Sequence, residues 1–176
     1  MLYDFIHEPR TAYFSMEICL EQAIPTYSGG LGVLAGDTLR SAADLQLPMC
    51  GVTLAHRKGY FRQHLDPQGN QTEAPSDWSP ESSLPAAGPT VTVEIEGRQV
   101  KVRAWIYTVR GVTKGEIPVL LLDTALEENS EFDRTLTDTL YGGDNHYRLC
   151  QEVVLGMGGA AMLRALGWDA DLQYHI

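Results

Sequence analysis

Residues 11–55 decide the fold class, and they read TAYFSMEICLEQAIPTYSGGLGVLAGDTLRSAADLQLPMCGVTLA. The apolar run at 11–17 predicts a strand, and the glycine-rich segment 28–32 follows it as a turn. Residues 33–45 have the spacing of a helix, and the apolar run 49–55 is typical of a strand buried on both faces. This order of strand, turn, helix and strand indicates an α/β fold.

The faces of the expected helix are set by its spacing. One side carries Leu34, Thr38, Ala42 and Leu45, which is the expected apolar side. Asp37, Arg40 and Asp44 are spaced to meet on the opposite side and to form ion pairs there. We therefore expect one apolar and one charged side.

The rest of the chain predicts further strands and one long helix. Residues 91–106 alternate apolar and polar side chains around a Glu-Gly-Arg turn, as in a hairpin, and 118–123 is a buried-type strand that ends at Asp123. Residues 144–166 have helical spacing, and 171–176 resembles the start of another strand. We expect one partial Rossmann-like domain over 1–176, with a proline-rich excursion at 73–89 and a β-rich insertion at 90–122.

Composition narrows the classes of function. The 176 residues carry a formal net charge of -10, which argues against nucleic acid and anionic membranes as partners. No run reaches the ~18 apolar residues of a membrane helix, and no signal peptide is recognisable, so a cytoplasmic location is expected. Cys19, Cys50 and Cys150 lie far apart, and the histidines lack metal-ligand spacing. No disulfide and no metal site is expected.

The glycine-rich segment 28–32 is the first candidate site. It precedes a helix, where glycines let the backbone approach a ligand and where the free N–H groups of the first turn favour an anion. Its spacing matches neither the dinucleotide fingerprint nor the P-loop. The alternative is a tight turn that needs positive φ, and composition alone favours this alternative slightly.

Polar residues near the ends of the expected elements are further candidates. Glu17 ends the first strand, where open α/β sheets place ligand-contacting residues, and a salt-bridging or capping role is the alternative. Asp144 and Asn145 follow a second glycine pair just before the long helix, and an N-cap is the alternative. The basic segment 56–62 would hold an anion or form a solvated edge.

Several motifs together resemble α-glucan phosphorylases. They occur in the order and with the separations of that family, and they are AYFSME at 12–17, PTYSGGLGVLAGD at 25–37, RKGYFRQ at 57–63, DW at 77–78, LYGGDN at 140–145 and RLCQE at 148–152. The resemblance is to the shorter prokaryotic branch of the glycogen, starch and maltodextrin phosphorylases. It covers nearly the whole chain.

The resemblance implies a fold and a reaction. These glycosyltransferases have the two-domain GT-B architecture, with the active site in the cleft between two Rossmann-like domains. In the family, inorganic phosphate cleaves the terminal α-1,4 linkage of a glucan and releases glucose 1-phosphate, with the help of pyridoxal phosphate. The present chain is similar to the first part of the N-terminal domain. The lysine that holds the cofactor would lie in a C-terminal domain that is absent here, so no pyridoxal phosphate is expected on this chain.

The resemblance also assigns roles to residues. The first glycine loop would present helix-start amides to the phosphate and line the sugar site, and the second would be a mobile loop that gates the cleft. The substrate-binding residues expected from the motifs are Glu17, Gly29, Gly30, Leu31, Asp144 and Asn145. No complete catalytic set is expected in this chain.

Two hypotheses follow for the chain. In the first, it is the N-terminal portion of an α-glucan phosphorylase and is inactive alone. In the second, it is a stand-alone module that binds a glucan or phosphate. Because residues 171–176 resemble a strand without its neighbours, self-association is a further expectation.

Overall fold

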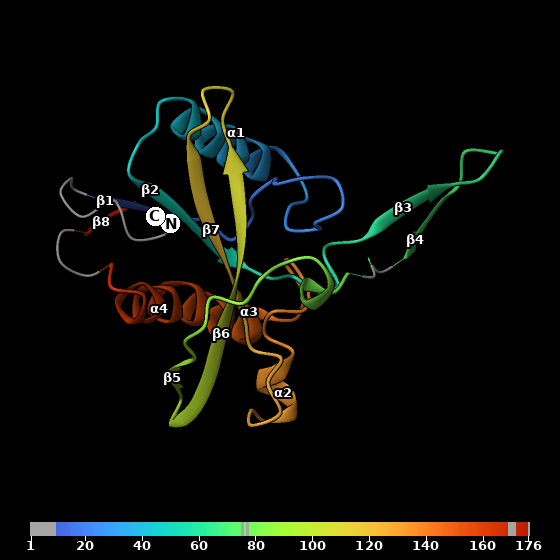
Figure 1. The fold of residues 1–176 in the computed structure, drawn as a ribbon. Coiled ribbons are helices and arrows are strands. Elements are labelled where there is room, and N and C mark those ends of the chain that lie inside the picture. Colours follow the sequence, from blue (N-terminus) through green and yellow to red (C-terminus); the bar gives the residue numbers. More distant parts are fainter. Residues whose placement is uncertain (1–9, 75, 77, 169–171, 176) are drawn as a thin grey trace.

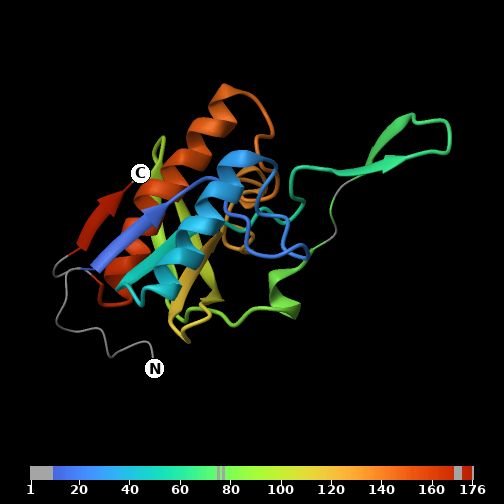
Figure 2. The same ribbon diagram turned by 90° about the horizontal axis from the view of Figure 1, so that it is seen from above.

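The structure, a computed structural model, describes residues 10–74, 76, 78–168 and 172–175. Its main sheet has six strands in the order β5-β6-β7-β2-β1-β8, and helices cover both faces (Figures 1 and 2). The strands are β1 (Arg10–Phe14), β2 (Met49–Leu54), β3 (Arg62–Leu65), β4 (Gln71–Ala74), β5 (Val91–Ile95), β6 (Arg98–Arg110), β7 (Glu116–Asp123) and β8 (Leu172–His175). The helices are α1 (Gly30–Asp44), α2 (Glu131–Arg134), α3 (Asn145–Val153) and α4 (Gly159–Ala165), with a 3-10 turn η1 (Pro80–Ser82) and a π turn η2 (Val154–Gly158).

The centre of the sheet is parallel. β1 pairs in parallel with both β2 and β8, and β2 pairs in parallel with β7. The long strand β6 runs antiparallel to β7 through 103–110 and antiparallel to β5 through 98–102. The expectation of a mixed α/β fold is confirmed. The strands expected as an insertion at 90–122 extend this same sheet.

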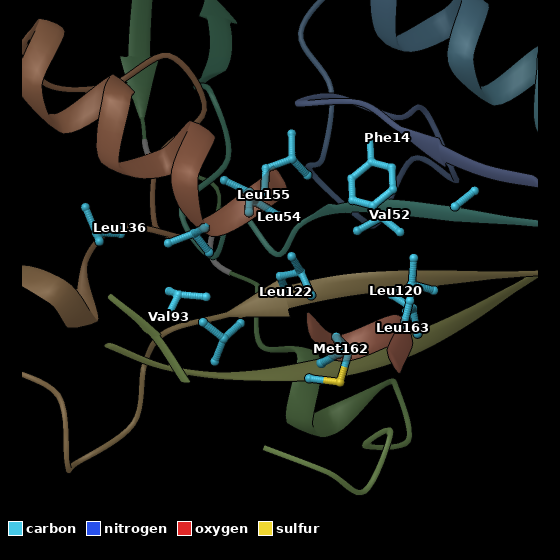
Figure 3. Packing of buried hydrophobic residues seen from close by; sticks show 14 of the residues in the cluster. Phe14, Val52, Leu54, Val93, Leu120, Leu122, Leu136, Leu155, Met162 and Leu163 are labelled. Carbon is cyan, nitrogen blue, oxygen red and sulfur yellow. The ribbon is translucent and has the colours of Figure 1, made fainter. Parts of the chain in front are cut away.

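Side chains on the central strands alternate between two apolar cores. On β7, Leu120 and Leu122 belong to the core beneath α3 and α4, whereas Val119 and Leu121 belong to the core beneath α1. Figure 3 shows the first core, in which Met162 of α4 lies among the strand residues. Strands that bury both faces explain the continuous apolar runs in the sequence.

The helix α1 is present, but of the side expected to be apolar only Ala42 is buried. Its buried residues are small ones and one leucine: Gly32, Ala35, Gly36, Leu39, Ala42 and Ala43. Leu34 and Leu45 are 63% and 70% exposed. The helix lies so close to the preceding loop that a Cβ on Gly36 would fall 2.2 Å from the carbonyl oxygen of Cys19. Close approach therefore selects small residues for the buried side.

The expected ion pairing on α1 is confirmed in part. Arg40 pairs with Asp37 at 3.3 Å. Asp44 instead accepts a hydrogen bond of 2.7 Å from the backbone N–H of Val112 in the β6–β7 turn. The helix is thus tied to the sheet at its C-terminal end.

The remaining elements refine the expectations. The helix expected at 144–166 is present as α3, η2 and α4 in succession, and Gly167 has φ +79 just beyond it. The expected terminal strand is present over Leu172–His175, while 171 and 176 lie outside the described residues. The proline-rich excursion contains the end of β4 and the turn η1, and 75 and 77 lie outside the described residues.

The hairpin β3–β4 was not expected from the sequence. It forms a separate two-stranded sheet that projects from the body (Figures 1 and 2). Every residue of β3 is exposed, so the strand lacks the apolar alternation that reveals a half-buried strand. The turn residues 66–70, DPQGN, are its sequence signal.

Candidate functional site

Glu17 joins two loops that are far apart in the sequence. Its Oε2 accepts hydrogen bonds from the backbone N–H of Ser28 at 2.8 Å and of Gly29 at 3.3 Å. Its Oε1 accepts a bond of 2.8 Å from the hydroxyl of Tyr141. The residue is 3% exposed. One buried anion therefore brings together the glycine segment 28–32 and the second glycine loop 141–145.

These hydrogen bonds keep Glu17 ionised. Burial raises the pKa of a carboxyl group, but the donors from Ser28, Tyr141 and Gly29 outweigh burial and hold the pKa of Glu17 below its ordinary value. Burial and the neighbouring carboxylate raise the pKa of Tyr141 to about 12. The tyrosine is thus a stable donor at neutral pH. Contact between Glu17 and a ligand stays a prediction, and in the structure its carboxylate holds the two loops.

Gly29 and Gly30 of the first glycine loop do not need to be glycine for the chain's own conformation. Gly29 has φ -159, which any residue adopts, and Gly30 is the first residue of α1. A Cβ added at Gly29 or Gly30 would meet no heavy atom within 4 Å. By contrast, a Cβ on Gly32 would lie 2.5 Å from the Cβ of Tyr27, so this position has no room for a side chain. The alternative of a tight turn with positive φ is wrong for these residues.

The start of α1 has the features of an anion site. The first N–H groups of a helix have no intrahelical acceptor, and the helix dipole favours negative charge there. Gly29 is the N-cap without a side-chain cap, and no acidic residue lies in the first turn. The N–H of Gly29 donates to Glu17. The amides of Gly30 and Leu31 are therefore the next N–H groups that an anion could bind. Leu31 is 69% exposed beside them.

The second glycine loop is held at both ends. Tyr141 has φ +57 and Gly143 has φ +70, so the backbone turns sharply here. Asp144 is the N-cap of α3, and its side chain accepts a hydrogen bond of 2.9 Å from the N–H of Tyr147. The capping role weighed for Asp144 is confirmed. Asn145 is the first helical residue and is exposed, and its contact with a sugar stays a prediction.

An open cavity of about 480 Å³ lies beside the first glycine loop. Aromatic, amide and guanidinium side chains line it, which are groups that suit polar ligands with apolar faces. The lining residues are Gln22, Ala23, Pro25, Tyr27, Ser28, Tyr60, Phe61, Arg62, Gln63, Ser76 and Trp78.

The basic segment 56–62 is mostly paired within the chain. Arg57 lies 2.6 Å from Asp123, and Lys58 lies 2.7 Å from Asp138. Arg62 lines the cavity. The hypothesis that this cluster as a whole holds an external anion is therefore wrong, because Arg57 and Lys58 already form ion pairs with carboxylates of the chain itself.

Asp123 is the centre of a buried polar network whose extent the sequence did not reveal. It is fully buried and accepts hydrogen bonds from Arg57, Arg103 and the indole N–H of Trp105. Burial raises the pKa of Asp123, but these donors outweigh it and the pKa is well below its ordinary value. Glu81 pairs with both arginines and so ties the turn η1 to the sheet. The network is structural, since its donors are satisfied internally.

His56 is a second buried polar residue with a structural position. Its Nε2 donates a hydrogen bond of 2.7 Å to the carbonyl oxygen of Met16, next to Glu17. Its Nδ1 has no hydrogen-bond partner among the described residues. Burial lowers the pKa of His56 to about 4, so the ring is neutral at pH 7. The histidine supports the backbone that carries Glu17.

Comparison with known proteins identifies the family. A family model described as carbohydrate phosphorylase matches residues 19–117. The chain therefore belongs to the carbohydrate phosphorylase family. It is 42% identical over 163 residues to a glycogen phosphorylase of Mycobacterium tuberculosis, and 38% identical over 170 residues to a maltodextrin phosphorylase of Thermococcus litoralis. A glycogen phosphorylase of Aquifex aeolicus is 31% identical over 180 residues.

The similarity covers most of this chain and a small part of its relatives. The matches take in 88%, 92% and 99% of this chain, but 18%, 20% and 25% of the three relatives. Across the part of the chain that the structure describes, no helix has the length and apolar character needed to cross a membrane.

Proposed function

We propose that the chain is the N-terminal part of an α-glucan phosphorylase and forms one wall of its active-site cleft. In that reaction, inorganic phosphate cleaves a terminal α-1,4 linkage of a glucan to give glucose 1-phosphate. The observation that carries the proposal is the pair Gly29 and Gly30. Neither needs glycine for its φ or for space within the chain, so close approach of a ligand remains as the reason for glycine there.

The position of the loop in the sheet supports the proposal. The chain passes from β1 to β2 and β7 on one side of β1 and then returns to β8 on its other side. α1 covers one face of the sheet and α4 covers the other (Figure 1). In open α/β sheets, ligands bind beyond the carboxyl ends of the strands where the order reverses. Glu17 and the loop to Gly30 follow the carboxyl end of β1, as the Rossmann-like half of a GT-B enzyme requires.

In the proposed reaction, the residues of the two loops have different roles. The amides of Gly30 and Leu31 and the dipole of α1 stabilise phosphate charge without reorganisation when the linkage breaks. Asn145 offers a neutral donor to a sugar hydroxyl. Glu17 does not touch the reacting atoms in this scheme. It fixes the distance between the loops through its bonds to Ser28 and Tyr141.

Pyridoxal phosphate does not fit this chain. A covalent site needs a lysine held in a pocket, and the three lysines are Lys58, Lys101 and Lys114. None is buried, and Lys58 and Lys101 form ion pairs with Asp138 and Glu128. The cofactor is therefore assigned to the part of the relatives' length that this chain does not span.

The substitution Gly30→Ala tests the proposal. The added Cβ meets no protein atom, and alanine is the better helix former by about 0.5–1 kcal/mol, so stability should not fall. Phosphorolysis of a maltooligosaccharide, measured as glucose 1-phosphate released by the full-length phosphorylase that carries this segment, should fall about 10²-fold because the phosphate is displaced.

Gly156→Ala is the matched control. Gly156 lies in the helical turn η2, and a Cβ there also meets no heavy atom within 4 Å. This variant should keep both stability and activity. A Gly30→Ala enzyme with unchanged kcat/KM would contradict the proposed role of the loop.

A further inference from the structure

Three side chains with metal-binding atoms meet outside the glycine loops. Glu96 lies in the turn between β5 and β6, and His146 and Cys150 lie one turn apart on α3. The Nε2 atom of His146 is 3.0 Å from Oε1 of Glu96 and 3.9 Å from Sγ of Cys150. One ligand atom from each residue lies within 4.8 Å of the others. The cluster joins two elements that are 50 residues apart in sequence.

The spacing of these atoms is close to that of a tetrahedral zinc site. Bonds of about 2.0–2.1 Å to nitrogen and about 2.3 Å to sulfur imply ligand separations of about 3.6 Å for N···S and about 3.3 Å for N···O. The separations of His146 from Cys150 and Glu96 each differ from these values by a few tenths of an ångström. Side-chain rotation can supply such a change.

We propose that Glu96, His146 and Cys150 bind a divalent zinc-like cation, with a fourth position left for water. Mixed nitrogen, sulfur and carboxylate ligands are typical of Zn²⁺, and three protein ligands with one open position is a known arrangement. The sequence did not predict the site because its carboxylate comes from a distant hairpin turn. The inference does not depend on the proposed function of the glycine loops.

The charges around the cluster also suit a dication. Arg98 donates to Oε2 of Glu96 at 2.9 Å and to Asp133 at 3.2 Å, so Oε1 of Glu96 remains for the cation. With Cys150 as a thiolate, Glu96, Asp133 and Cys150 carry three negative charges. The guanidinium of Arg98 carries one positive charge, so an excess of two negative charges remains. A divalent cation neutralises this excess, whereas Arg98 alone cannot.

The ligands are held in place by their neighbours. The ring of His146 stacks on Phe132, with centroids 5.8 Å apart and planes at 26°. Glu96 has φ +51 and Gly97 has φ +78, so the two-residue turn fixes the direction of the carboxylate. Cys150 is buried at 2% exposure, which limits its movement. Supports of this kind orient the ligands of metal sites.

Binding exchanges protons for the cation. In the metal-free chain, Nε2 of His146 carries the ring proton and donates a hydrogen bond to Glu96. In the metal complex, the lone pair of Nε2, the Cys150 thiolate and Oε1 of Glu96 each form one bond to the cation. The thiol proton goes to the solvent, and the proton on Nε2 of His146 is exchanged through solvent to Nδ1, so that the ring stays neutral. No redox step is involved.

Cobalt substitution tests the site directly. Addition of Co²⁺ to the purified metal-free protein should produce a thiolate-to-cobalt charge-transfer band, which reports a sulfur ligand, and Zn²⁺ should abolish it by competition. His146→Asn, on the exposed side of α3, and Cys150→Ser should each lose the band. Both should bind zinc at least about 10–100-fold more weakly, since this is the cost of losing even an outer-shell partner.

Matched variants separate the site from other thiols and histidines. Cys19→Ser and His64→Ala remove a cysteine and a histidine outside the cluster, and both should keep the band and the zinc affinity. Far-ultraviolet circular dichroism checks that each variant is folded. The proposal is overturned if no charge-transfer band forms, or if folded His146→Asn binds zinc as tightly as the parent.

Discussion

The hydrogen bond between Tyr141 and Glu17 should be measurable by the substitution Tyr141→Phe. Phenylalanine keeps the ring and its edge contact with Tyr60, at 6.4 Å between centroids, and removes the hydroxyl that donates to Oε1 at 2.8 Å. A hydrogen bond to a charged acceptor contributes about 1.5–3 kcal/mol. Because Tyr141 is 37% exposed, water replaces part of the bond, and we expect a loss of about 1.5 kcal/mol.

Urea unfolding at pH 7 measures this loss, and its pH dependence checks the cause. The bond is made to the ionised carboxylate, and the pKa of Glu17 is lowered in the folded state. The stabilisation is therefore complete above the ordinary carboxyl pKa of about 4.3 and is lost as pH falls through the folded pKa. The difference between parent and Tyr141→Phe should shrink in the same range.

A double-mutant cycle with Glu17→Gln completes this test. If the bond is the cause, the two substitutions should be coupled by about 1 kcal/mol, and Tyr60→Phe should change stability by less than about 0.5 kcal/mol. A loss for Tyr141→Phe below about 0.5 kcal/mol, or additivity with Glu17→Gln, would refute the view that this pair holds the loops together.

Three further predictions concern Asp123, Glu81 and His56. Asp123→Ala should destabilise the chain by about 3–5 kcal/mol in urea unfolding, because it leaves Arg57 and Arg103 without their buried partner; a loss below about 1 kcal/mol would show that the network is not the anchor. The hydrogen bonds from Arg57 lower the pKa of Glu81 to about 2. The stabilisation that ionised Glu81 gives the fold is therefore complete above the ordinary carboxyl pKa and should be lost as pH drops toward about 2. Glu81→Gln should remove that part of the loss of stability in acid. The pKa of His56 is lowered to about 4, so the unfolded chain takes up a proton first and the free energy of unfolding should fall as pH drops from about 6.5 to about 4. His56→Gln should flatten that slope in urea titrations at several pH values, and an unchanged slope would contradict a buried neutral ring.

Local patterns predicted most of the fold, for a physical reason. The strands β2 and β7 are buried on both faces, and continuous apolar runs such as 49–55 are the direct result. The helix α1 was predicted, but its buried face was not, because that face is chosen by close approach to the loop at Cys19 rather than by apolar area. The hairpin β3–β4 has no buried face at all, so hydrophobic spacing could not reveal it.

The candidate site was predicted as separate residues and not as an arrangement. The motifs pointed to Glu17 and to both glycine loops, but the contact between Glu17 and Tyr141 spans 124 positions and leaves no local signal. The same holds for the cluster of Glu96 with His146, whose partners are 50 positions apart. Chemistry of single residues can be recognised in a sequence, whereas their pairing depends on the folded sheet.

The π turn η2 has a consequence for the phase of the whole C-terminal helix. The buried residues recur as neighbouring pairs every four positions, at 150–151, 154–155, 158–159 and 162–163. In a regular α-helix each step of four advances about 400°, so the last pair would be rotated by about 120° from the first. The wider π turn takes up this excess, so that Cys150 and Met162 both reach the same core. A change in the number of residues within 154–158 would therefore rotate everything after it relative to the sheet.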